Sequence, residues 1–372
     1  MDYGAISLDT SIFDEKGLKL ESGILKTLEQ FKGKPSHLVL SEIVVREVHT
    51  HLTKKAKEAR YSLLKAIRES KVHLTVDDES EKIAFDALVP EIDDNEVAKK
   101  RLEDFGKNTG AEIIPATGRV DLDEIVKKYF EAEPPFEESG KKKSEFPDAI
   151  ALMSIESWAN ENNTKVLAVA RDGDWKRFAE ESDYIDVVED LAEAISKFQP
   201  HSSAIDFCTD IAKLLPTEKP EELYKSIQHY LCEQVAEIEV HAEASSQFFY
   251  EPDYVELVFE SFDFVCDESG NAVLQPVQGQ NNIVIIEAKI VVSAEASTSF
   301  SLAVHDSIDK DYVSIGSSSA STEMEFEAEV LLTFEGDFEK GIDFVELVEC
   351  EILSSPSDVD FGDIEPDWCH EE

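Results

Sequence analysis

Short apolar segments alternate with longer amphipathic segments through the first 200 residues of the chain. Runs of apolar residues predict short buried strands at residues 5–8, 37–40, 72–76, 165–170 and 185–188. Apolar residues at helical spacing predict helices at residues 23–31, 41–70, 79–106 with a break at Pro90, 122–131, 147–162, 175–181 and 189–198. This alternation favours an α/β domain whose sheet is mostly parallel and flanked by helices.

The pattern changes after residues 199–203. Two helices are predicted at residues 204–215 and 221–234, separated around Pro216. Apolar residues then alternate with polar ones, mainly Glu, and strands are predicted in VAEIEVHAEA (235–244), MEFEAEVLLTF (324–334), 255–265, 273–277, 283–292 and 344–352. This alternation is typical of an antiparallel sheet with one solvated, acidic face. The Ser-rich residues 317–322 are predicted to form a loop.

We therefore expect three parts: an α/β domain over residues 1–198, an acidic α+β domain over 204–353, and a partly disordered acidic tail over 354–372. Charge distinguishes the two halves, because residues 201–372 hold 39 acidic side chains against 6 basic ones, within a total net charge of −46. A chain this acidic does not attract nucleic acid through its overall field, since phosphate affinity comes from clustered cations. Any contact with nucleic acid must use a local basic patch.

The five cysteines and the hydropathy restrict the class of protein further. All the cysteines lie in the second half, widely spaced and without a CxxC pair, which excludes a zinc framework and favours free thiols. No apolar run has the length of a membrane span, and the first residues lack the basic and apolar segments of a secretory signal. We expect a cytoplasmic protein that does not bind a membrane.

Four carboxylates lie where a parallel α/β sheet collects functional side chains. Asp9 follows the first predicted strand in ISLDTSIF, and Asp172 follows a later strand in VLAVARDGDW, with Asp174 two residues on. Asp148 begins a helix in EFPDAIAL, and Glu47 lies in the second helical turn after another strand, in SEIVVREV. Because strand carboxyl ends and the following helix starts share one rim of the sheet, these side chains are expected to face one another.

Carboxylates held this closely repel one another unless a cation compensates their charge. Mg²⁺ and Mn²⁺ prefer oxygen ligands and bind through a few carboxylates together with substrate phosphates. One or two such ions can activate a water for hydrolysis of a phosphodiester bond, and no nucleophilic Ser or Cys is evident or needed. The pattern thus predicts a metal-assisted phosphodiesterase.

Each carboxylate also has an ordinary structural interpretation. Asp9, Asp172 and Asp174 are common turn and cap residues, Asp148 complements a helix dipole, and Glu47 lies at the border of a buried helix face. Taken singly, each is more often structural than catalytic in a chain with 81 acidic residues. The order of the four along the chain is harder to obtain by chance. Glu42 is a weaker rival for the role of Glu47, because it directly follows a helix cap at Ser41.

The order of LDTSIF, SEIVVREV, EFPDAIAL and VARDGDW resembles that of the PIN-domain nucleases. The resemblance covers about residues 1–198 and is closest to the larger bacterial PIN-like proteins, which carry an inserted helical segment. It implies a metal-dependent ribonuclease or flap-type nuclease fold. The metal ligands it implies are Asp9, Glu47, Asp148 and Asp172, with Asp174 accessory, and Thr10 or Ser11 holding a metal-bound water or a phosphate. The second half resembles nothing of assigned function.

Cations near these carboxylates are candidates for guiding the substrate. Lys141, Lys142 and Lys143 precede the Asp148 helix directly, and Arg171 precedes Asp172. The long helix carries more cations, which a solvated face explains better than substrate binding: Arg46, Lys54, Lys55, Lys57, Arg60, Lys65 and Arg68. His49 and His51 are expected at the surface, and Trp175 is expected to pack rather than to stack on a base.

The leading hypothesis is an Mg²⁺- or Mn²⁺-dependent endoribonuclease, with RNA expected in preference to DNA. The alternatives are a catalytically silent PIN-like interaction or regulatory protein and a structure-specific DNA nuclease, and a toxin or antiviral role is compatible with the leading hypothesis. The acidic second half is expected to bind a protein partner, to self-associate, or to mask the nuclease by offering carboxylates where phosphates would bind.

Overall fold

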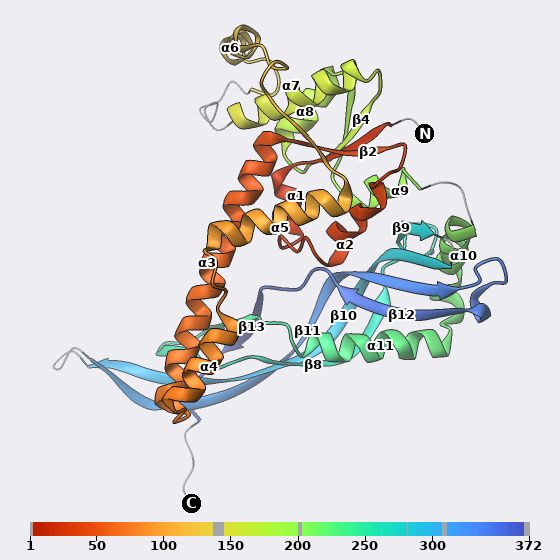
Figure 1. Ribbon diagram of the computed structural model, residues 1–372. Helices are drawn as coiled ribbons and strands as arrows, with labels where there is room; N and C mark the ends of the chain where they lie inside the picture. The colour runs from red at the N-terminus through yellow and green to blue at the C-terminus, as the bar shows by residue number, and fades with distance from the viewer. Residues whose placement is uncertain (1–2, 137–144, 200–202, 281, 307–310, 368–372) are drawn as a thin grey trace, which may run out of the picture. The chain divides into compact units, whose positions relative to one another are not determined.

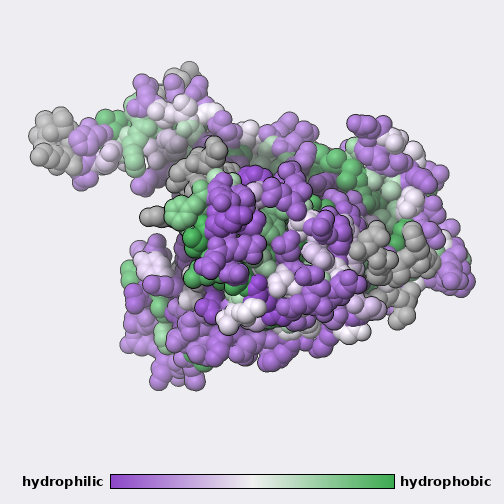
Figure 2. Space-filling model, turned by 90° about the horizontal axis from the view of Figure 1, so that it is seen from above, coloured by the Kyte–Doolittle hydropathy of each residue, from purple (hydrophilic) through white to green (hydrophobic). Residues whose placement is uncertain are grey.

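The computed structural model describes residues 3–136, 145–199, 203–280, 282–306 and 311–367. The chain divides into two compact units, Met1–Phe198 and Gln199–Glu372, each with its own secondary structure (Figure 1). Hydrophilic side chains cover most of the face seen in Figure 2, as expected when 31% of the residues are charged. Within the described ranges, none of the helices combines the length and apolarity needed to cross a membrane.

The first unit contains a five-stranded sheet in the order β3-β2-β1-β4-β5, and every pair in it is parallel. Its strands are β1 (Ala5–Leu8), β2 (His37–Ser41), β3 (Glu112–Ile114), β4 (Val166–Val169) and β5 (Ile185–Val188). The chain first adds β2 and β3 on one side of β1, and later adds β4 and β5 on the other side. The strand order therefore reverses between β1 and β4, and in sheets of this class ligands bind at such a reversal. The prediction of a mostly parallel α/β domain is confirmed.

Helices supply the remainder of the first unit. They are α1 (Thr10–Glu15), α2 (Gly23–Lys26) with the 3₁₀ helix η1 (Thr27–Phe31), α3 (Glu42–His73), α4 (Asp78–Leu88), α5 (Asp94–Thr109), α6 (Leu122–Glu131), α7 (Phe146–Glu161), α8 (Gly173–Glu181) and α9 (Leu191–Ser196). Helix α7 packs on β2, β3 and β4 and buries Leu152 and Ile155 completely. Helix α3 buries Val44, Val48 and Leu52 in its first turns. Both helices that carry a predicted carboxylate are thus fixed against the core.

Two local predictions for the first unit differ from the structure. Residues 72–76 were expected to form a strand, but α3 continues through His73 and leaves the Val72 side chain 70% exposed. A continuous helix satisfies the backbone of these residues without a neighbouring strand. Strand β3 was not predicted, because only Ile114 of its three side chains is buried and the apolar run is short.

The second unit is built on a long antiparallel hairpin of β10 (Ile283–Asp306) and β11 (Asp311–Gly336). Strand β12 (Val345–Ile352) pairs with the free side of β11. The free side of β10 receives three separate strands: β7 (Phe249–Pro252), β8 (Glu256–Phe264) and β9 (Leu274–Gln280). The expected α+β domain rich in antiparallel strands is confirmed.

Two helices cover the apolar face of this sheet, α10 (Ser203–Glu218) and α11 (Glu221–Val235). Ile211 of α10 and Leu231 of α11 lie in one buried cluster with Ile286 of β10 and Val330 of β11. Pro216 was expected to separate the helices, but it lies in the last turn of α10, which ends two residues later.

Three segments of the second unit also differ from expectation. Residues 317–322 are part of β11 rather than a loop, and the hydroxyls of Ser299 and Ser319 lie 3.1 Å apart across the hairpin. Residues 235–244 form a strand only at β6 (His241–Ser245). Residues 354–372 contain β13 (Asp358–Asp363), which pairs in parallel with β6 and buries Val359. These polar segments pair as strands because their side chains are short or because apolar residues recur at every second position.

Candidate active site

Two of the predicted aspartates lie at the point where the strand order of the first unit reverses. Asp9 directly follows β1, and Asp172 follows β4 after a short turn. Each is the N-cap of the next helix: Asp9 accepts from the backbone of Thr10 at 2.7 Å, and Asp172 accepts from the N–H of Asp174 at 3.0 Å. The structural interpretation of both residues as caps is therefore correct. Oδ1 of Asp9 accepts from Thr10 and Oδ2 from Ser11, whereas Asp172 accepts from Asp174 through Oδ1; these contacts fix both carboxylates at the rim.

Thr10 connects the end of β1 with α3, the helix that follows β2. Its hydroxyl donates to the Glu47 Oε2 atom at 2.7 Å, and Glu47 lies on α3, which follows β2. The Ser11 hydroxyl donates to Asp9. Asp9 and Thr10 are both buried, with exposed fractions of 6% and 8%. The two hydroxyl residues after β1 thus orient the carboxylates of Asp9 and Glu47.

Asp148 lies in the first turn of α7 and is half-buried. The indole N–H of Trp175, a fully buried side chain on α8, donates to its Oδ1 atom at 3.1 Å. Burial raises the pKa of Asp148 to about 7, and repulsion by Asp9, Asp172 and Glu47 adds to the increase, while the Trp175 hydrogen bond opposes it. Burial likewise raises the pKa of Asp9, and Asp172 contributes.

The four predicted carboxylates therefore form one electrostatic group from four separate elements of the first unit. Within the described part of the chain, no three of them hold carboxylate oxygens all within 4.8 Å of one another. Mg²⁺ and Mn²⁺ bind a few carboxylates directly and keep several waters. An all-oxygen donor set in which the pKa values of Asp148 and Asp9 are raised fits a hard divalent cation and not a soft one.

The other predicted site residues take different positions. Asp174 forms an ion pair with Arg177 within α8. Arg171 forms a two-point ion pair with Glu15 of α1, with Nε–Oε2 and Nη2–Oε1 distances of 2.8 and 3.0 Å. Arg171 is thus held next to Asp172 while its side chain stays half-exposed. Lys141, Lys142 and Lys143 lie outside the described residues.

The structure separates Glu42 from Glu47. Glu42 accepts from the N–H of Ala116 at 3.0 Å and pairs with Arg46, so it faces away from the carboxylate group. The cations of α3 are largely paired with acidic residues of the same unit, among them Lys65 with Glu69. A solvated, ion-paired helix face explains them, as expected.

Sequence reasoning missed two contacts of this region. Trp175 was expected only to pack, but it also donates to Asp148, and a buried indole that must find a partner was the available signal. His51 lies at the surface, as expected, and its Nδ1 atom also lies 2.8 Å from Asp14 of α1, a contact that was not predicted. The pairing follows from the packing of α1 on α3, which no local pattern reveals.

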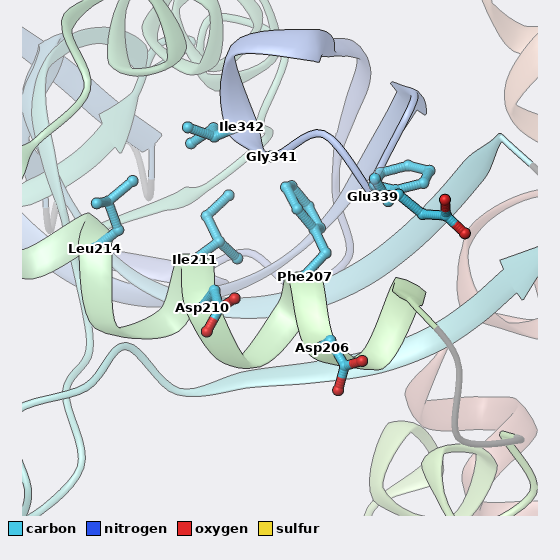
Figure 3. A pocket seen from close by; sticks show the side chains of 9 residues that line it. Asp206, Phe207, Asp210, Ile211, Leu214, Glu339, Gly341 and Ile342 are labelled. Carbon is cyan, nitrogen blue, oxygen red and sulfur yellow. The ribbon is translucent and has the colours of Figure 1, made fainter.

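The second unit offers a pocket of a different kind, with a volume of about 700 Å³. The side chains of Phe207, Ile211 and Leu214 project from α10 toward Ile342 (Figure 3). Its described lining adds three carboxylates, Asp206, Asp210 and Glu339, and no cation. Such a lining does not suit a phosphate.

The first unit thus combines a parallel α/β sheet with carboxylates at its strand-order reversal, where sheets of this class bind ligands. Residues 6–175 match the family model of the PIN domain, so the first unit is a PIN-like domain. The searches of curated proteins and of solved structures found no match. PIN domains are in general metal-dependent nucleases that act on nucleic acids.

Proposed function

We propose that the first unit is an Mg²⁺- or Mn²⁺-dependent endoribonuclease. The observation that supports this most strongly is the gathering of Asp9, Glu47, Asp148 and Asp172 in one group, where burial, with added repulsion from the other three carboxylates, raises the pKa of Asp148 to about 7. Such repulsion stabilises nothing in the free protein, and a divalent cation would relieve it. The arrangement is therefore better suited to binding a metal than to maintaining the fold.

In this proposal the four carboxylates hold one or two ions, with Asp174 accessory. A bound divalent ion supplies an activated water and neutralises charge at the scissile phosphate. Thr10 and Ser11 keep the carboxylates of Glu47 and Asp9 aimed at the site, and the Trp175 N–H favours the ionised form of Asp148. Arg171 and Lys141–Lys143 guide the phosphate backbone of the RNA strand.

The test is cleavage of matched RNA and DNA panels in Mn²⁺, Mg²⁺ or EDTA. We expect endonucleolytic cleavage of RNA with either metal, faster than of DNA, and none in EDTA. Asp148→Asn should reduce the rate by at least the roughly 10- to 100-fold that loss of an outer-shell partner costs a metal site. Asp123→Asn is the matched control, because Asp123 is also in a first helical turn but is exposed.

Cleavage that survives both EDTA and Asp148→Asn would overturn the mechanism. Faster cleavage of DNA than of RNA would reject the endoribonuclease and support the alternative of a DNA nuclease. Metal binding without cleavage of either panel would favour the catalytically silent, regulatory alternative.

We also propose that the second unit binds a protein partner or a second copy of the chain. Its six lysines against 39 acidic side chains make it unsuited to nucleic acid, and its apolar pocket with acidic margins suits an apolar side chain flanked by cations. Size measurement across a range of protein concentrations would separate self-association from binding of another protein.

A further inference from the structure

A pocket of about 360 Å³ lies directly beside the carboxylates of the first unit. One wall is a face of α3, which contributes Ile43, Glu47 and Thr50. The opposite wall is the first turn of α7, which contributes Phe146 and Ile150, on either side of Asp148. The pocket thus includes one predicted metal ligand and surrounds the start of the helix that carries another.

The wall formed by α7 is apolar, and two further aromatic rings pack against it. The Phe146 ring lies 5.0 Å from the Tyr129 ring of α6 and 5.1 Å from the Phe136 ring, measured between centroids. These contacts hold the Phe146 ring in place, so it meets a ligand without losing much rotamer freedom. A fixed aromatic and two isoleucine side chains form a surface for a flat, weakly polar group.

Polar groups lie along the α3 side of the same pocket. His51 is oriented by Asp14, with Nδ1–oxygen distances of 2.8 and 2.9 Å, which leaves its Nε2 atom available for another partner. Arg46 has a largely exposed side chain, 76% by area, although it pairs with Glu42. A ligand with a flat apolar face and polar edges matches this combination, whereas a purely aliphatic ligand does not use it.

We propose that this pocket receives one unpaired base of the substrate strand, from a nucleotide next to the scissile phosphate. The proposal rests on the nuclease function proposed above, and it adds a subsite that the four carboxylates do not supply. Its volume is near the lower end of the roughly 300–1,000 Å³ of small-ligand sites, which suits one base and not a base pair. A base within a duplex would have to leave its stack to enter.

The test uses single-stranded oligonucleotides in which one nucleotide at a time is made abasic. With the full-length protein and Mn²⁺, we expect kcat/KM to fall about 10- to 100-fold at one position next to the cleaved bond, and much less elsewhere, because one base–aromatic contact is lost. Pairing that position in a duplex should have a similar effect.

Thr50→Trp provides the complementary arm, since an indole at this exposed pocket residue fills the site. The variant should cleave the intact strand about 10-fold more slowly and should lose its sensitivity to the abasic position. Ser62→Trp is the matched control: Ser62 is also an exposed hydroxyl residue on α3, lies outside the pocket, and should leave the abasic profile unchanged. Circular dichroism melts verify that both variants fold.

Three results would overturn the inference. A flat abasic profile in a cleaving enzyme would reject the base subsite and leave the nuclease function intact. A sensitive position that persists in Thr50→Trp would place the base elsewhere. Absence of both binding and cleavage of every strand would reject the nuclease function, and the subsite with it.

Discussion

Two buried tryptophans of the first unit each donate an indole N–H to a carboxylate. Trp175 donates to Asp148 at 3.1 Å, and Trp158 donates to Glu112 at 2.9 Å. Asp148 belongs to the carboxylate group, whereas Glu112 belongs to β3 and does not contribute to the pKa of Asp148. Substituting Trp175 and Trp158 separately therefore distinguishes two effects. One is the loss of a hydrogen bond to the carboxylate group, and the other is the general loss of a buried indole.

We predict that Trp175→Phe weakens Mn²⁺ binding about 10-fold, because an outer-shell donor that orients a metal ligand is removed. Titration calorimetry with the full-length protein measures the change. Trp158→Phe should lose comparable stability and bind Mn²⁺ as the parent does. Equal weakening by both substitutions would show that the Trp175 contact has only a structural role.

The raised pKa of Asp148 predicts a specific pH dependence of stability in the metal-free protein. The folded pKa, about 7, lies above the ordinary value of 3.8, so the folded state binds more protons between these two pH values. Stability therefore falls as pH rises from about 4 to about 7 and is not lost further above that. Asp148→Asn removes this loss of stability and should be roughly 2–4 kcal/mol more stable than the parent at pH 8.

Denaturant unfolding at pH 4, 6 and 8 in EDTA measures this difference, which should shrink toward zero at pH 4. Saturating Mn²⁺ at pH 8 should reverse the order, because it stabilises the parent and not the variant. A pH-independent difference between the two proteins would contradict the assignment of the raised pKa to Asp148.

At the scale of residues, local patterns in the sequence predict the carboxylates but not their partners. Asp9 and Asp172 follow strands, Asp148 begins a helix, and Glu47 lies in the second turn of another helix. The contacts of Trp175 with Asp148 and of Thr10 with Glu47 join residues 27 and 37 positions apart. Such contacts depend on how helices pack, which hydrophobic periodicity does not specify.

At the scale of elements, β10 shows how burial alternates along one strand. Ile286 is fully buried in the cluster under α10 and α11, whereas Ile283, three residues earlier, is 37% exposed. We predict that Ile286→Ala lowers the free energy of unfolding of the second unit by about 2–5 kcal/mol, because it leaves a cavity in a packed core.

Ile283→Ala is the matched control for that substitution and should cost about 0.5 kcal/mol, since its side chain already contacts water. Urea unfolding followed by far-UV circular dichroism measures both values. Equal losses for the two variants would contradict the assigned register of β10 against β11.

Element predictions from the sequence were correct where a cap residue or an apolar pattern marked the element. They failed where neither signal was present. Ser41 was expected to cap α3, and its hydroxyl accepts from Ile43 at 3.3 Å. Strands β10 and β11 were predicted too short, because their outer halves are rich in Ser, Thr and Ala, which carry little apolar signal. Pairing with a long partner, rather than strand propensity, keeps those residues extended.

At the scale of the whole molecule, charge is the dominant property. Residues 201–372 carry −33 of the total net charge of −46, and an RNA strand approaching the chain is repelled by this excess. We predict that deleting residues 199–372 raises kcat/KM for RNA several-fold at low salt, and that the gain disappears as salt screens the repulsion.

Steady-state cleavage at roughly 20 and 300 mM salt, where the Debye length is about 20 Å and about 6 Å, measures the gain. The full chain is the reference, and a melt of the truncated protein verifies that the first unit folds. Unchanged or lower activity at low salt would reject electrostatic masking by the second unit.

The arrangement of strands around β10 has a consequence for synthesis on the ribosome. Strands β7, β8 and β9 all precede β10 in the chain, and each of them pairs with it. They must therefore emerge before their ladder partner exists, with apolar positions exposed for as long as translation of β10 takes. The carboxylates of β7 and β8 repel the same segments of neighbouring nascent chains during that interval, whereas β9 carries none. We therefore expect the acidity of these two strands to limit aggregation before the second unit has folded.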